Sequence, residues 1–257
     1  MLIKNYFVRL IEGEKIAKLR TQPSQRRIFR FDASTFFTQY RRLEDIHAFM
    51  DYLARQWPKL VTIDSIGKTY EGRDMRILRI TGTGPGLKRI NRRPKKVNPQ
   101  GSTVTRSRQT TRSQGKRTSG KPILWLDAGI HAREWVAPPT ALYTALYMLE
   151  SYTNGDQQAV QILDTLELIV LPSANPDGYE YSHTYDRMWR KTRSVNANSR
   201  CRGVDPNRNF DYKWNTIGAS SNPCDETYAG PRAFSEVETQ AISNYILSHK
   251  DKIKVSF

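Results

Sequence analysis

The sequence has no hydrophobic run long enough to cross a membrane. A spanning helix needs about 18 consecutive apolar residues, and no segment of this 257-residue chain approaches that length. The first 19 residues also lack the apolar core of a secretion signal, because Lys4, Arg9, Glu12 and Glu14 interrupt them. We therefore expect no membrane contact, and no secretion signal is visible at this end.

Acidic residues are few compared with basic ones, and the excess of positive charge lies in two segments. The chain has 41 Lys and Arg against 25 Asp and Glu, which is a formal net charge of +16. Residues 1–31 carry a net charge of +6 and residues 84–121 carry +12, so the remainder of the chain carries −2. A positive charge confined to two segments does not favour a protein that binds polyanions as a whole.

Residues 84–121 contain no acidic side chain and few apolar ones. The segment is rich in Pro, Gly, Ser, Thr and Arg, so it cannot bury enough apolar surface to offset the entropy lost on ordering. Because it separates two predicted strands, we expect a disordered insertion in a surface connection. Basic tracts without interleaved aromatic residues bind anions with little selectivity, so we expect no specific nucleic-acid site.

Short apolar runs predict most of the strands. These runs are Val61–Ile66, Met75–Ile80, Ile123–Leu126 and Leu166–Leu171, with alternation starting again at Ile253. The turn residues Tyr70–Arg73 make the first two strands a hairpin or a pair of adjacent strands, and Asn175–Gly178 predicts another turn. Strands that alternate with helical patterns indicate an α/β protein.

Helices are predicted where apolar residues recur every three to four positions. One helix begins at Leu43 and stops near Trp57-Pro58, and a second begins at Pro138. A third has Ser235 as its N-cap. The residues that this last helix is expected to direct inward are Val237, Ile242, Tyr245, Ile246 and Leu247.

The strand at 123–126 leads into a corner with a metal-ligand pattern. His131 and Glu134 stand three residues apart where the chain bends toward the next helix, so an imidazole and a carboxylate can face one point. Zinc accepts such a mixed nitrogen and oxygen pair. The carboxyl ends of strands in open α/β sheets are also where ligands bind. A His-x-x-Glu pair alone is a weak signal, so its meaning depends on the blocks that accompany it.

Three further polar blocks follow the corner: Met188–Arg193, Gly203–Phe210 and Cys224–Tyr228. Together with His131–Trp135, and in this order and spacing, they resemble the zinc metallocarboxypeptidases of the pancreatic carboxypeptidase A and B type. The resemblance runs from about Phe31 to Phe257, apart from the insertion. It implies a three-layer α/β/α fold with a central mixed sheet, and an enzyme that hydrolyses the C-terminal peptide bond of peptides and proteins.

The resemblance also implies a role for individual residues. His131 and Glu134 would bind one Zn²⁺, and Arg190 would polarise the scissile carbonyl. A catalytic zinc takes three protein ligands. The family's third ligand, a histidine, and its general base, a glutamate, have no counterpart among these residues, and His47, His183 and His249 match no ligand motif.

Three residues are implied to hold the substrate. Asn207 and Arg208 would grip the terminal carboxylate, and Arg133 would help to position the peptide. A planar guanidinium forms a two-pronged bond with a carboxylate, and an adjacent amide adds a donor. Recognition of a free carboxylate is what makes an exopeptidase.

The resemblance further implies a disulfide between Cys201 and Cys224, although the two residues alone leave a pair of reduced thiols open. A disulfide would indicate an oxidising, extracellular compartment and a secreted protein. Residues 1–31 would be the tail of a pro-segment, with Arg26-Arg27 or Arg30 as an activation site, and residues 32–257 a partial catalytic domain.

We therefore expect a monomeric zinc carboxypeptidase whose catalytic domain is truncated at its C-terminal end, with little or no activity as this chain. Its partners would be peptide or protein C-termini and the pro-segment. One alternative is a non-catalytic protein that binds peptide C-termini through Asn207 and Arg208. Another is a nucleic-acid binder acting through residues 84–121.

Overall fold

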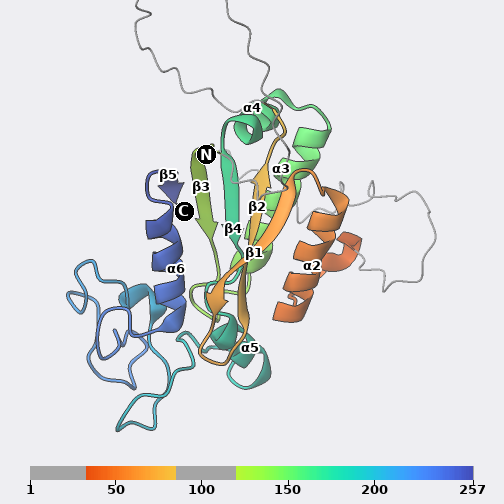
Figure 1. The fold of residues 1–257 in the computed structure, drawn as a ribbon. Coiled ribbons are helices and arrows are strands. Elements are labelled where there is room, and N and C mark those ends of the chain that lie inside the picture. The colour runs from red at the N-terminus through yellow and green to blue at the C-terminus, as the bar shows by residue number, and fades with distance from the viewer. Residues whose placement is uncertain (1–32, 85–119, 257) are drawn as a thin grey trace, which may run out of the picture.

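The computed structural model describes residues 33–84 and 120–256 (Figure 1). The predicted pro-segment tail at 1–31 lies outside the described residues, as does all but the ends of the insertion predicted at 84–121. The described part of the chain is arranged around one sheet, with helices on both of its faces (Figure 1).

Five strands form the sheet, in the order β1-β2-β4-β3-β5. Their bounds are Val61–Lys68 (β1), Asp74–Thr81 (β2), Ile123–Asp127 (β3), Glu167–Leu171 (β4) and Ile253–Ser256 (β5). β1 and β2 form the predicted hairpin, and β2 also pairs antiparallel with β4. Since β3 runs parallel to both β4 and β5, the sheet is mixed, as expected.

Helices pack against one face of the sheet through a shared apolar core. The two predicted ones are α2 (Leu43–Gln56) and α3 (Ala137–Thr153), and α4 (Gln157–Thr165) was not predicted. Asp156 starts α4 by accepting a hydrogen bond from the backbone N–H of Ala159 at 2.9 Å. The core members with no exposed surface include Phe49, Leu53, Leu78, Leu142, Leu163 and Val170.

The helix on the opposite face, α6 (Val237–Ser248), begins one residue later than expected, with Glu236 rather than Ser235 as its N-cap. The expectation that Val237 and Leu247 point inward is wrong, because they are 39% and 60% exposed. The residues that α6 buries are Glu238, Thr239 and Ile242.

A second apolar cluster fills the space between α6 and the sheet. Trp125 of β3 has no exposed surface, and its ring centroid lies 5.3 Å from that of Tyr245. Ile242 and Ile246 join the same cluster, as predicted. Apolar cores on both faces of the sheet confirm the three-layer α/β/α architecture.

The turn predicted at Asn175–Gly178 is instead the start of a helix, α5 (Pro176–Thr184). The Asn175 side chain accepts a hydrogen bond from the backbone N–H of Gly178 at 3.0 Å, and the proline occupies the first turn. Asparagine caps and proline at the first helical position are signals for a helix start as much as for a turn.

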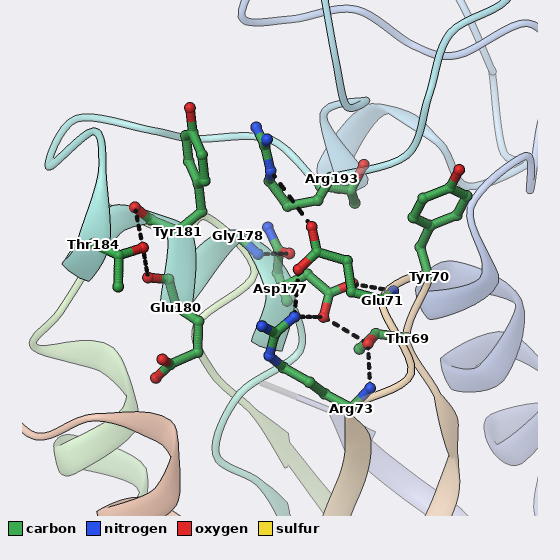
Figure 2. A network of polar contacts seen from close by, with 12 residues as sticks. Thr69, Tyr70, Glu71, Arg73, Asp177, Gly178, Glu180, Tyr181, Thr184 and Arg193 are labelled. Carbon is green, nitrogen blue, oxygen red and sulfur yellow. Dashed lines mark hydrogen bonds and ion pairs between the residues drawn. The ribbon is translucent and has the colours of Figure 1, made fainter.

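A carboxylate of α5 anchors the turn between β1 and β2 (Figure 2). Asp177 has no exposed surface, and its Oδ1 accepts hydrogen bonds from Thr69 Oγ1 at 2.6 Å and Arg73 Nη1 at 2.8 Å. Its Oδ2 accepts a third from the backbone N–H of Glu71 at 2.7 Å. The tip of the hairpin is therefore fixed to the end of the domain where α5 lies.

A second carboxylate reaches the same turn from α6. Oε1 of Glu238 accepts a hydrogen bond from the backbone N–H of Tyr70 at 2.9 Å, while Oε2 is buried without a hydrogen-bond partner among the described residues. Burial raises the pKa of Glu238 to about 7, although the bond from Tyr70 opposes the increase. This contact explains why α6 turns Glu238 inward.

A buried lysine joins the two ends of the segment that contains the insertion. Lys121 Nζ donates hydrogen bonds to Thr81 Oγ1 at 3.0 Å, to the Gly82 carbonyl at 2.9 Å and to the Leu163 carbonyl at 2.9 Å. Three acceptors match the three donors of an ammonium group. The chain therefore leaves the sheet after β2 and returns before β3 at the same place.

No helix in the described ranges has both the length and the apolar character needed to cross a membrane.

Candidate active site

The predicted metal corner lies between β3 and α3. Gly129 makes the bend with a φ of +65°, and a Cβ at this position would lie 3.2 Å from Pro138 Cγ, so the passage favours glycine. His131 follows and is buried, whereas the Glu134 side chain is half exposed. Nδ1 of His131 lies 2.9 Å from Oε1 of Glu134, so the two expected ligands face each other.

The other imidazole nitrogen faces a buried carboxylate. Nε2 of His131 lies 3.3 Å from Oδ1 of Asp205, which has no exposed surface. Burial alone would raise the pKa of Asp205, but contacts with His131 and Arg190 outweigh it and hold the pKa below its ordinary value. Asp205 therefore lies behind Nε2, and Nδ1 is the imidazole nitrogen that faces Glu134.

Arg190 is held by the same carboxylate. Its Nε and Nη2 donate to Oδ2 of Asp205 at 3.1 and 2.9 Å. The backbone N–H of Ala132 also donates to the Arg190 carbonyl at 3.1 Å, so the segment that carries Arg190 lies against the metal corner. The structure thus brings Arg190 close to His131 and Glu134, which belong to a different sequence block.

The two residues expected to hold a terminal carboxylate follow Asp205 directly. Asn207 and Arg208 belong to η3 (Pro206–Arg208), and the backbone N–H of Asn207 donates to Oδ1 of Asp205 at 2.9 Å. Arg208 Nε donates to the Gly218 carbonyl at 2.9 Å, and Nη1 to the Asn207 carbonyl at 3.1 Å. Both residues line a small cavity of about 90 Å³.

Arg133 points to a different place from Asn207 and Arg208. Its Nη1 lies 3.0 Å from each carboxylate oxygen of Glu226 and 3.3 Å from the Met188 carbonyl. Glu226 and Met188 line a larger cavity of about 450 Å³, which Arg190 also lines. Arg133 is therefore held beside the larger cavity by an ion pair.

The disulfide between Cys201 and Cys224 is present, with an S–S distance of 2.09 Å and Cα atoms 5.1 Å apart. It joins two parts of the polar region that the sequence shows as loops, and both cysteines line the larger cavity. The alternative of two reduced thiols is therefore not what the structure shows.

The residues at the corner fit two of the three positions in a zinc site. An imidazole nitrogen and a carboxylate oxygen face each other, and a carboxylate behind the imidazole is the usual support of a zinc-bound histidine. Within residues 33–84 and 120–256, no group of three His, Cys, Asp or Glu side chains is placed to hold a metal. The donor set therefore fits zinc and is incomplete in the described part of the chain.

Comparison with known proteins shows the family of the chain. A family model described as zinc carboxypeptidase matches residues 46–257, from α2 to the last residue. The chain belongs to the zinc carboxypeptidase family.

Curated carboxypeptidases are similar to this chain over most of its length. Carboxypeptidase B of Astacus astacus is 36% identical over 220 residues, which cover 85% of this chain and 60% of that protein. Carboxypeptidase A2 of Mus musculus is 41% identical over 213 residues, which cover 83% of this chain and 42% of that protein. The chain thus spans about half the length of these relatives.

Solved carboxypeptidase structures share the fold. Bovine thrombin-activatable fibrinolysis inhibitor, in a complex with tick carboxypeptidase inhibitor, matches 85% of this chain with a TM-score of 0.65 and 29% identity, over 59% of its own length. Carboxypeptidase A of Helicoverpa armigera matches 98% of this chain with a TM-score of 0.64 and 28% identity, over 52% of its own length.

Asp205 is a residue of the candidate site to which the sequence analysis assigns no role. Its Asp-Pro pair signals a carboxylate that caps a short helix, and Oδ1 does accept the Asn207 N–H. The contacts with His131 and Arg190 join segments that are distant in the sequence, so no local pattern contains them.

Proposed function

We propose that the whole protein is a zinc-dependent carboxypeptidase that hydrolyses the C-terminal peptide bond of peptides and proteins. The observation that carries this proposal is the buried Asp205, whose Oδ1 lies 3.3 Å from Nε2 of His131 and whose Oδ2 accepts hydrogen bonds from Arg190. One carboxylate thereby positions both an expected metal ligand and an expected cation at the scissile carbonyl.

The metal would be held by His131 and Glu134. When bound, zinc polarises a carbonyl and lowers the pKa of its water. Asp205 contributes by holding the imidazole so that Nδ1, rather than Nε2, faces Glu134. Such supporting partners orient a ligand and raise its basicity.

Arg190 would stabilise the oxyanion that develops on the scissile carbonyl. Its guanidinium is fixed in advance by two hydrogen bonds to Asp205, and its side chain is largely buried. A fixed cation in a site of low dielectric stabilises developing charge without a cost of reorganisation.

Arg208 and Asn207 would bind the terminal carboxylate. Arg208 uses Nε and Nη1 within the chain, and its Nη2 makes no hydrogen bond in the described ranges. The guanidinium lies beside a cavity of about 90 Å³, so a carboxylate there would find a free donor. Arg133, paired with Glu226, would hold the peptide at the larger cavity.

The disulfide supports a secreted, extracellular protein, because such bonds persist in oxidising compartments. We further propose that the protein acts as a monomer on peptide C-termini and that residues 32–257 belong to its catalytic domain. In this proposal residues 1–31 are the tail of a pro-segment, and no nucleic acid is a partner.

Binding of a peptide with a free C-terminus, compared with its C-terminal amide, tests the carboxylate site. We expect the free acid to bind about tenfold more tightly, since hydrogen bonds to charged groups contribute about 1.5–3 kcal/mol. Arg208→Gln should remove this preference. Arg232→Gln replaces an exposed arginine of the same region and should keep it. Equal binding of acid and amide by the unaltered chain would contradict the proposal.

Product analysis then separates the enzyme from the alternative of a non-catalytic binding protein. Release of single C-terminal residues that stops in a chelator and in His131→Ala supports the carboxypeptidase. Tight binding of the free acid by the full-length protein without any release supports the alternative.

A further inference from the structure

The larger cavity, of about 450 Å³, is lined by an excess of cations that the proposed chemistry does not use. It lies next to Arg190 and shares no lining residue with the cavity at Arg208. Its five cationic lining residues are Arg190, Lys191, Arg193, Arg200 and Arg202. Its two acidic lining residues are Asp186 and Glu226.

Both acidic residues already have partners. Glu226 pairs with Arg133 at 3.0 Å, and Oδ1 of Asp186 accepts a hydrogen bond from the backbone N–H of Met188 at 3.0 Å. Among the cations, Arg190 is bound to Asp205, and Lys191 Nζ donates to the Pro223 carbonyl at 2.6 Å. The three other cationic residues of the lining are Arg193, Arg200 and Arg202.

Arg193 is the buried one of these three, at 8% exposure. Its Nε has no hydrogen-bond partner among the described residues, and the nearest carboxylate oxygen, on Glu71, is 3.8 Å away. Figure 2 shows the guanidinium extending past Glu71 beside Tyr181, and it lies 3.5 Å from the centroid of that ring. Burial lowers the pKa of Arg193 and the charge of Arg202 adds to this effect, while Tyr181 and Glu71 oppose it. A nearby anion would relieve both penalties.

Arg200 and Arg202 are exposed and flank Cys201. Neither forms an ion pair within the described ranges, although both line the cavity. The disulfide between Cys201 and Cys224 fixes the backbone between the two arginines. Both cations are therefore held beside the cavity.

We propose that this cavity binds the carboxylate of an acidic residue located before the scissile bond of the peptide substrate. The proposal rests on the proposed carboxypeptidase function. A peptide with its last residue at Arg208 and its scissile carbonyl at Arg190 would direct its preceding residues to the other cavity that Arg190 lines. The protein would therefore prefer acidic peptides, with Arg193, Arg200 and Arg202 as the recognition residues.

Binding of a peptide series tests this preference. Each peptide has a free C-terminus and carries one Glu in place of Gln, at successive positions before the last two residues. We expect about tenfold tighter binding for at least one position, as for a charge-assisted hydrogen bond. Inorganic sulfate should weaken the binding of the Glu peptide more than that of the all-Gln peptide, because both present a terminal carboxylate to Arg208 and only the first carries a second anion. The double variant Arg200→Gln/Arg202→Gln should abolish the gain.

The matched control is Arg55→Gln, which removes an exposed arginine from α2 and should retain the gain. Arg208→Gln separates the two proposals, because it should lose the preference for a free C-terminus and keep the preference for Glu. If no position of Glu improves binding, or if the gain survives in the Arg200→Gln/Arg202→Gln double variant, the cavity is not an acid-recognition site. If the unaltered chain binds the free acid and its amide equally but still prefers Glu, the result counts against the proposed carboxypeptidase function and not against acid recognition by the cavity.

Discussion

Asp205 and Arg190 are joined by two hydrogen bonds to a single oxygen, Oδ2, at 3.1 and 2.9 Å. The remaining oxygen, Oδ1, is left to face His131 at 3.3 Å and to cap η3 through the Asn207 N–H. The buried Asp205 side chain therefore contacts three parts of the candidate site. These are the corner that would bind metal, Arg190 as the expected oxyanion cation, and the start of the segment that carries Asn207 and Arg208.

Asp205→Asn should weaken zinc binding by about 10- to 100-fold, the usual effect of losing a partner behind a ligating histidine. The amide removes the negative charge that faces Nε2 of His131 and would support the ligating imidazole. Competition with a chromophoric chelator measures the change. Asp211→Asn alters an exposed aspartate of the same region and should leave zinc affinity unchanged. Equal affinities of the two variants would show that Asp205 does not support the metal site.

Glu238 should make stability depend on pH between about 5 and 7. Burial raises its pKa to about 7, above the ordinary value of 4.5, so the folded chain keeps a proton that the unfolded chain releases. Stability is therefore greatest below the unfolded pKa and falls as pH rises toward 7. The loss should approach about 3 kcal/mol, at about 1.4 kcal/mol for each unit of pKa.

Urea unfolding at a series of pH values measures this loss. Glu238→Gln should flatten the decline between pH 5 and 7, because an amide has no proton to release. Glu44→Gln, at an exposed position of α2, should leave the decline unchanged. A decline of the same size in Glu238→Gln would assign it to other groups.

Asp177→Asn should lower the free energy of unfolding by about 2 to 4 kcal/mol. The change breaks a buried set of contacts with Thr69, Arg73 and the Glu71 N–H, and leaves donors without a charged partner. Asp74→Asn is the matched control, because it breaks an exposed ion pair with Lys68 and should cost about 0.5 kcal/mol or less. Chemical denaturation compares the two, and costs of equal size would refute a structural role for the Asp177 network.

Removing the disulfide should cost about 3 kcal/mol, as expected for a loop closed by cysteines 23 residues apart. A reductant should destabilise the unaltered chain and have no effect on the Cys201→Ser/Cys224→Ser variant, since the sequence has only these two cysteines. The urea midpoint reports both comparisons. An unaltered chain whose midpoint does not move under reductant would show that the bond contributes little.

The strands and the larger helices could be predicted because their apolar patterns are local. β4, with all five residues buried, follows from an uninterrupted apolar run. Helix α4 was missed because it buries only Ala159 and Leu163, too few for a clear period. Leu247 was misplaced because the inward face of α6 is set by the contact of Glu238 with Tyr70, which is distant in the sequence.

In the candidate site, too, local motifs could be predicted and contacts between distant segments could not. The block that contains Asn207 and Arg208 was found from its motif, and the structure places both residues beside one cavity. The support from Asp205 and the cation-lined cavity depend on which segments meet in space. Neither could be inferred from residues 120–256 read in order.

Lys121 fixes the point at which the chain leaves the sheet after β2 and returns to it before β3. Because Lys121, two residues before β3, donates to the Gly82 carbonyl, the two ends of the intervening connection are held at one point of the sheet. In general, doubling the length of a connection between fixed ends costs only about 0.6 kcal/mol of closure entropy. A change in the length of the connection between these two points should therefore leave the strands on either side in place.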